Sequence, residues 1–137
     1  MAGYSGTPLP QKLGIKANAR VALVNAPPDF LTTLGALPPG VILVKQLRAP
    51  LDVIIWFTKS ESELLKRFGE LAAKLASAGG LWIAWPKKAS GVPTDLTENV
   101  IRQIGLAAGL VDNKVCAIDE TWSGLRFVIR LKDRAGG

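Results

Sequence analysis

The sequence predicts a single α/β domain of three layers, in which a mostly parallel sheet lies between helices and ends in an antiparallel hairpin. Three observations support this prediction. Short apolar runs alternate with segments of helical periodicity along residues 20–109, as in strands joined by crossover helices. Two alternating segments separated by a turn then follow. The length of 137 residues suits one domain with its own core.

Residues 1–19 are predicted to form an extended N-terminal arm laid over the domain, because they are rich in Gly, Ser, Pro and Lys. Leu9, Leu13 and Ile15 are the side chains that can anchor this arm. The α/β domain is expected to span residues 20–132, and residues 133–137 to form a loose C-terminal tail.

The first half of the domain contains three predicted strands and one short helix. RVALVN (20–25) is an apolar run bounded by turn residues, which indicates a buried strand. Pro28 can occupy the first turn of a helix in FLTTLGAL (30–37). VILVKQ (41–46) is the second strand. DVIIWFT (52–58) is the third, and because it is apolar on both faces we expect it to be central.

The connection between the second and third strands, LRAPL (47–51), is short. A parallel crossover usually takes a dozen or more residues. Two arrangements remain open: the two strands pair antiparallel, or a stretched loop recrosses the sheet. We favour the stretched loop.

The clearest helix begins at Ser60, since Ser60 and Glu63 have the S-x-x-E spacing of a capping box. Its apolar face comprises Leu64, Phe68, Leu71 and Leu75. Gly79 and Gly80 are predicted to end this helix, because glycine accepts the left-handed geometry beyond a helix C-terminus. LWIAW (81–85) is the fourth strand.

A second helix is predicted after the loop WPKKASG. Asp95 and Glu98 repeat the capping spacing, with Asp95 as the cap, and Gly109 ends the helix. Its apolar stripe comprises Leu96, Val100, Ile104 and Ala107. The hairpin then pairs VDNKVCAID (111–119) with LRFVIRLK (125–132), with Gly124 in the turn. Its period-two residues are Val115, Ala117, Phe127, Ile129 and Leu131.

The carboxyl edge of this Rossmann-like sheet is the expected binding edge, because helix N-termini with free N–H groups converge there. The candidates for an anion or partner site are Asn25, Lys59, Trp85, Lys87, Lys88, Ser90, Thr94 and Trp122. The lysines would act as mobile point charges. Acidic residues at the same helix starts oppose this assignment, and a solvated turn is the alternative for WPKKASG. These residues are Asp29, Glu61, Glu63 and Asp95.

Composition excludes several kinds of site. The chain has no histidine, which rules out Ser-His-Asp and Cys-His nucleophiles and imidazole metal sites, and we expect no metal. The single cysteine, Cys116, is expected to be a small buried hydrophobe. The net charge of +6 suits an acidic partner or simple solubility. No stretch approaches the length of a membrane span, so the cytoplasm is the expected location.

The tryptophans have different predicted roles. Trp56, Trp82 and Trp85 lie within strands and are expected to be core residues. Trp122 lies in the predicted turn ETWSG, where it either caps the hairpin or fills a partner's pocket. The adjacent carboxylates Asp119 and Glu120 are poor candidates for acid–base work, because a hairpin tip offers little burial.

Two long stretches carry a family resemblance. GYSGTPLPQKLGIKANARVALVNAP (3–27) and WPKKASGVPTDLTENVIRQIGLAAGLVDNKVCAIDETWSGLRFVIR (85–130) resemble a family of small bacterial proteins catalogued as "domain of unknown function thirty fifty-two". That family has no assigned activity. The resemblance therefore places WPKKASG in a family motif and implies no catalytic role for its lysines.

A second resemblance is architectural. The succession of strands and helices from DVIIWFT to LRFVIR resembles the closing half of class I methyltransferases, which also end in an antiparallel hairpin. The chain looks like a truncated version of that fold. The turn after the first strand is NAPPDF rather than a glycine-rich loop, so no cofactor is expected.

The sequence thus predicts a non-catalytic α/β binding or interaction module. Its working surface would be the basic loop edge together with the N-terminal arm, and its partner an anionic ligand, nucleic acid or an acidic protein. The alternative is a degenerate transferase that uses Asn25, Lys87 and Asp119 around a small anionic substrate. A homo-oligomer with an incidental basic face is a third possibility.

Overall fold

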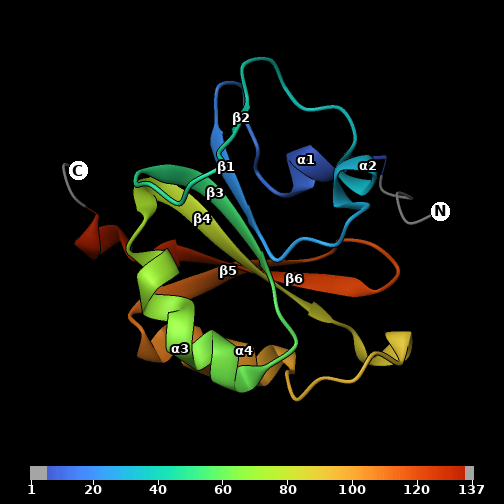
Figure 1. Ribbon diagram of the computed structural model, residues 1–137. Helices are drawn as coiled ribbons and strands as arrows, with labels where there is room; N and C mark the ends of the chain where they lie inside the picture. Colours follow the sequence, from blue (N-terminus) through green and yellow to red (C-terminus); the bar gives the residue numbers. More distant parts are fainter. Residues whose placement is uncertain (1–5, 135–137) are drawn as a thin grey trace.

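The computed structural model of the protein describes residues 6–134, and these form a six-stranded sheet with helices on both faces (Figure 1). The strands are β1 (Arg20–Val24), β2 (Ile42–Leu43), β3 (Leu51–Phe57), β4 (Leu75–Pro86), β5 (Leu110–Ala117) and β6 (Trp122–Ile129). The helices are α1 (Leu9–Lys12), α2 (Phe30–Leu34), α3 (Glu61–Ala72) and α4 (Glu98–Ala107), with 3-10 turns at Lys88–Ser90 and Leu131–Asp133. The strand order is β2-β1-β3-β4-β6-β5.

The sheet confirms the predicted fold class. β1 pairs parallel with β2 and with β3, and β3 pairs parallel with β4. β6 pairs antiparallel with both β4 and β5. The strands β2 and β3 lie on opposite sides of β1. The residues between them therefore recross the sheet as a stretched loop, and the antiparallel alternative for this connection is excluded.

The central strand β3 separates two hydrophobic clusters, one on each face of the sheet. Its Ile54 and Trp56 pack in the cluster under α3 and α4, whereas Ile55 and Phe57 pack in the cluster under α1 and α2. All four side chains are buried. This explains why residues 53–57 are all apolar, since a strand covered on both faces has no solvated side.

The predicted start of α3 is confirmed, but its predicted end is wrong. The Ser60 hydroxyl caps the helix by accepting a hydrogen bond from the Glu63 N–H at 3.2 Å. The helix ends at Ala72, and Leu75 through Gly80 belong to β4. A Cβ on Gly79 would lie 2.7 Å from the Leu51 carbonyl oxygen. Gly79 therefore permits close backbone approach between β3 and β4 rather than ending a helix.

The predicted cap of α4 is also wrong. Thr97 is the N-cap, and its hydroxyl accepts from the Val100 N–H at 3.2 Å. The Asp95 carboxylate instead accepts from the Glu61 N–H at 2.8 Å, so it stabilises the first turn of α3. The helix ends at Ala107, close to Gly109, which has φ of +93°. Of the predicted stripe, Leu96 is buried, and Val100 and Ile104 are partly buried against the core. Ala107 is exposed, and the buried positions within the helix are Ile101 and Gly105.

The hairpin is present, but its turn lies earlier than predicted. Gly124 is part of β6, where it pairs with Ala84 and Cys116. A Cβ there would lie 2.9 Å from Trp82 Cε3, so this glycine makes room for a buried ring. Val115 and Ala117, which lie in the edge strand β5, are exposed rather than part of the core.

The N-terminal segment packs on the domain through the predicted anchors. Leu13 and Ile15 are buried, and the Leu13 carbonyl accepts from Trp82 Nε1 at 2.9 Å. The segment is not extended throughout, since Leu9–Lys12 form the short helix α1. Of the predicted C-terminal tail, Ala135 to Gly137 lie outside the described residues. Between residues 6 and 134, no helix is long and apolar enough to cross a membrane.

Candidate functional site

The candidate residues lie at the carboxyl edge of the parallel strands, where six of them line two hollows and two, Lys87 and Ser90, line neither. The first hollow, of about 450 Å³, lies at the ends of β1 and β3. Its lining includes Asn25, Phe57, Thr58, Lys59, Glu63 and Trp122. The second hollow, of about 630 Å³, lies between the end of β4 and the start of α4. Its lining includes Trp85, Lys88, Val92, Pro93, Thr94, Leu96, Thr97 and Glu98.

The first hollow lies at the point where the order of strands in the sheet changes direction: β2 is on one side of β1, and the next strand in sequence, β3, is on the other side. Open α/β sheets bind ligands in the crevice at such a point. Asn25 follows β1 with φ of +57°, in the left-handed region that non-glycine residues seldom adopt. The backbone thus turns sharply out of the sheet at this residue.

Glu63 supplies the negative charge of the first hollow. Its carboxylate accepts a hydrogen bond from the hydroxyl of the buried Thr58 and a longer one, 3.5 Å, from Asn25 Nδ2. No lysine or arginine among residues 6–134 forms an ion pair with it. This hollow therefore offers a carboxylate held by neutral donors, and Lys59, which is exposed, is the lysine that lines it.

Trp122 forms a wall of the first hollow. Its ring packs edge-on against Phe57, with centroids 5.0 Å apart, and Phe57 packs in the same manner on Phe30. The side chain is half-buried. Trp122 therefore covers the end of β3 as the first residue of β6, which agrees with a packing role within this chain.

Lys87 and Asp119 hold the hairpin turn and line neither hollow. Lys87 Nζ donates to the Asp119 carbonyl oxygen at 2.8 Å. The Asp119 carboxylate accepts from the N–H groups of Thr121 and Trp122, each at 2.8 Å. Lys87 Nζ and one carboxylate oxygen of Asp119 are thus engaged in local structure. Of the three groups of the predicted transferase alternative, Asn25 lines the first hollow, and Lys87 and Asp119 line neither hollow.

Ser90 and Thr94 shape the loop that borders the second hollow. The Ser90 hydroxyl donates to the Lys87 carbonyl at 2.7 Å and accepts from the Val92 N–H at 3.1 Å. The Thr94 hydroxyl donates to the Lys59 carbonyl at 2.7 Å and accepts from the Leu96 N–H at 3.0 Å. These hydroxyls fix the loop, and the Thr94 bond joins it to the loop before α3.

The wall of the second hollow is mostly apolar, since Trp85, Val92, Pro93 and Leu96 contribute to it. Trp85 and Leu96 are 7% and 3% exposed, so the hollow has a packed floor. Lys88 is exposed at its rim, and within the described residues it forms no ion pair. Sequence reasoning found Trp85 and Lys88 but missed Val92 and Pro93, whose apolar character within a polar loop was the available signal.

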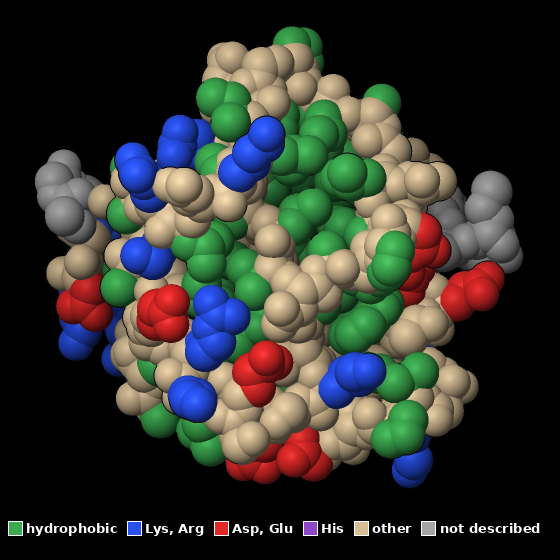
Figure 2. Space-filling view, in the orientation of Figure 1, with side chains coloured by type: hydrophobic (Ala, Val, Ile, Leu, Met, Phe, Trp, Pro, Cys, Tyr) green, Lys and Arg blue, Asp and Glu red, His purple; other side chains and the backbone are tan. Residues whose placement is uncertain are grey.

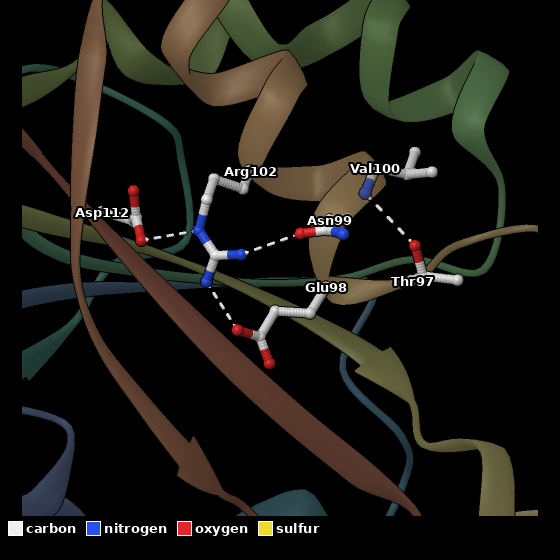
Figure 3. Close-up of polar contacts among 6 residues, drawn as sticks. All are labelled: Thr97, Glu98, Asn99, Val100, Arg102 and Asp112. Atoms are coloured by element: carbon white, nitrogen blue, oxygen red, sulfur yellow. Dashed lines mark hydrogen bonds and ion pairs between the residues drawn. The ribbon is translucent and has the colours of Figure 1, made fainter.

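The carboxylate of the second hollow, Glu98, is held by Arg102 (Figure 3). Arg102 Nη2 donates to Glu98, Nε donates to Asp112 at 2.9 Å, and Nη1 donates to Asn99 Oδ1 at 3.1 Å. Two hydrogen bonds raise the pKa of Arg102 above its usual value: the bond with Glu98 has the larger effect, and the bond with Asp112 has the next largest. The network ties the first turn of α4 to β5 and directs the Glu98 carboxylate to Arg102.

Three further features are the arrangement of potential metal ligands, the thiol of Cys116 and the strand tryptophans. Within residues 6–134, no three side chains of the types His, Cys, Asp and Glu gather closely enough to hold a metal ion. Burial raises the pKa of the half-buried Cys116 thiol, which lowers its thiolate fraction at neutral pH. Trp56, Trp82 and Trp85 are buried, as predicted.

Comparison with solved structures confirms the methyltransferase-like fold. A SAM-dependent methyltransferase from Aquifex aeolicus is 17% identical with a TM-score of 0.60, and the match covers 88% of this chain and 87% of that one. A methyltransferase from Pyrococcus furiosus is 14% identical with a TM-score of 0.59, over 90% and 80% of the two chains. Magnesium protoporphyrin IX methyltransferase from Synechocystis, with bound SAM, is 14% identical with a TM-score of 0.56, over 89% and 74%.

At these identities the likeness shows the fold alone. No curated protein matches the chain. Residues 43–131 match the family described as "Protein of unknown function (DUF3052)", and this match covers more than half of the chain. The matched range contains the second of the two stretches on which the resemblance is based, residues 85–130, and the protein therefore belongs to the DUF3052 family.

Proposed function

We propose that this protein is a non-catalytic binding module that holds an anionic ligand, or an acidic segment of a partner, in the second hollow. The observation that carries this proposal is the exposed Lys88 at the rim of a mostly apolar hollow of about 630 Å³. Binding sites for small molecules are typically concave, mostly apolar and supplied with a few placed polar groups.

The chemistry of the hollow favours a ligand with an apolar body and one anionic group. Trp85 and Leu96 offer apolar surface, while Lys88 offers one mobile positive charge. Nucleic acid is a less suitable partner, because its binding depends on several cations spread along a phosphate backbone. A carboxylate, a phosphate monoester or an acidic side chain of a peptide fits this arrangement better.

The non-catalytic character rests on the engagement of the polar groups. Lys87 and Asp119 are bonded to the hairpin turn, and Glu98 is bonded to Arg102. A general acid or base must reach the substrate with a suitably shifted pKa. We also propose a cytoplasmic location. Light scattering at high concentration tests the third prediction, a homo-oligomer, directly.

The test is a thermal-shift screen of phenyl phosphate, benzoate, nucleoside monophosphates and acidic peptides. A ligand of the folded state raises the melting temperature with concentration. Lys88→Ala should weaken binding by about tenfold or more, as expected for loss of one charged hydrogen bond. Lys132→Ala is the matched control, because Lys132 is exposed beyond the opposite end of β6. Equal binding by wild type and Lys88→Ala would reject the proposal.

A second candidate is supported by the first hollow. Its place at the chain reversal, in a methyltransferase-like fold, favours the alternative of a degenerate transferase acting on a small anionic substrate. Stabilisation by S-adenosylmethionine that is weakened by Glu63→Gln would support this alternative. The absence of any shift at millimolar S-adenosylmethionine would count against it.

A further inference from the structure

A third hollow, of about 360 Å³, lies at the opposite, amino edge of the sheet. It is bounded by the segment before β1, the start of β3 and the early part of β4, with one side chain from β6. Its lining comprises Gly14, Lys16, Ala17, Asn18, Ala19, Asp52, Ala78 and Arg126. None of these residues belongs to the two hollows at the loop edge.

Arg126 is the main cationic side chain that lines this hollow. It lies on the face of the sheet that the N-terminal segment covers, because its neighbours Leu125 and Phe127 are buried in the cluster on the α3 and α4 face. The guanidinium lies close over Gly80, where an added Cβ would be 2.3 Å from Arg126 Nε. The glycine therefore makes room for the guanidinium against the backbone of β4.

The described part of the chain leaves the charge of Arg126 uncompensated. Its donated hydrogen bond is to a neutral acceptor, Asn113 Oδ1, at 3.3 Å. No carboxylate within residues 6–134 forms an ion pair with it. Burial lowers the pKa of Arg126, and the positive charge of Arg134 lowers it further. A half-buried guanidinium without a counter-charge is unfavourable, since burial of a charge costs free energy unless it is paired.

The rest of the lining adds one cation and one anion. Lys16 is exposed at the edge of the hollow, where its ammonium group can reach a bound anion. Asp52 opposes anion binding, but its carboxylate is engaged by the backbone N–H of Arg20 at 2.8 Å. Arg126 and Lys16 together thus exceed the charge of Asp52.

We propose that this hollow binds an oxyanion, the phosphate or carboxylate group of a small molecule, with the Arg126 guanidinium as its main ligand and Lys16 as a second cation. A guanidinium presents parallel donors that match two oxygens of a phosphate or carboxylate. The volume admits a compact molecule rather than a long chain. The site is separate from the Lys88 hollow and acts whether or not that hollow binds a ligand.

The first test titrates inorganic phosphate and succinate into the protein against sodium chloride at equal ionic strength, with the melting temperature and amide chemical shifts as readouts. Phosphate or succinate should raise the melting temperature and shift the amides of Ala17, Asn18 and Ala78. The stronger of the two identifies the class of oxyanion. No concentration-dependent shift up to about 50 mM of either anion would overturn the proposal.

Variants separate a site at Arg126 from general salt effects. Arg126→Met should remove the response to either anion, and Arg126→Lys should weaken it at least several-fold, because a lysine keeps the charge but loses the paired donors. Lys16→Ala should weaken it less. Arg48→Met, which removes an exposed arginine elsewhere, is the matched control and should respond as wild type.

The melting temperature without ligand shows whether the Arg126→Met variant folds. In chloride alone, Arg126→Met should melt at or above the temperature of wild type, because it removes an unpaired half-buried charge while keeping apolar volume. In saturating phosphate or succinate this order should reverse. A lower melting temperature for Arg126→Met in chloride, or an anion response equal to that of wild type, would overturn the proposal.

Discussion

Gly105 is the position at which one added methyl group should most clearly disturb the support of the second hollow. It lies in α4, the helix whose first turn borders that hollow, and its backbone faces Phe127 of β6. A Cβ at Gly105 would lie 2.0 Å from Phe127 Cε1 and 2.5 Å from Cζ. The Phe127 ring is fully buried and packs edge-on against Phe68, with centroids 5.4 Å apart. It has little room to move.

Two opposing effects decide the outcome of Gly105→Ala. Alanine is favoured over glycine inside a helix by roughly 1 kcal/mol. Overpacking of a well-packed core costs about 1–3 kcal/mol. Because real Cβ atoms do not approach a ring to 2.0 Å, we place this site at the upper part of that range. The free energy of unfolding should therefore fall by about 1–2 kcal/mol.

Gly69 provides the matched control for this experiment. It lies near the C-terminal end of α3, as Gly105 does in α4, and an added Cβ would meet nothing within 4 Å. Gly69→Ala should raise the free energy of unfolding by roughly 0.5–1 kcal/mol. Urea unfolding followed by circular dichroism measures both changes, with the slope m unchanged. If Gly105→Ala stabilises the protein as Gly69→Ala does, the packing of α4 on β6 described above is wrong.

Two further predictions concern the capping residues and the thiol. Thr97→Ala should lower the free energy of unfolding by about 1 kcal/mol and speed amide exchange in the first turn of α4, because Thr97 caps that helix. Asp95→Ala should instead speed amide exchange at Glu61 in α3. Faster exchange in α4 with Asp95→Ala, and not with Thr97→Ala, would show that Asp95 is the cap of α4. Cys116 should react with iodoacetamide more slowly than a free cysteine at neutral pH, along a rate curve displaced to higher pH, because burial raises its thiol pKa. A rate equal to that of the urea-unfolded chain would contradict this.

Most of the fold follows from patterns that are local in sequence. The apolar run DVIIWFT marks the central strand because a strand covered on both faces needs no polar side. Ser60 and Glu63 mark a helix start because capping involves residues only a few positions apart. Two of the failures concern glycine. Gly79 and Gly124 resemble a helix end and a turn in sequence, yet both serve close contacts with distant residues, the Leu51 carbonyl and the Trp82 ring.

The candidate site was less predictable, because identical residues take different roles through distant contacts. Lys87 and Lys88 are adjacent in the sequence, but Lys87 bonds the carbonyl of Asp119 while Lys88 remains at the rim of a hollow. Likewise, Arg126 lies in an ordinary alternating strand. Its environment depends on Gly80 and on the segment before β1, which no local pattern connects to it.

The most direct test of the proposed function is amide chemical-shift mapping of the protein with phenyl phosphate. We predict perturbations centred on Gly91, Val92 and Thr94, which line the second hollow, and their loss in Lys88→Ala. Lys132→Ala should give the wild-type pattern. Perturbations that persist in Lys88→Ala, or that gather away from the second hollow, would contradict it.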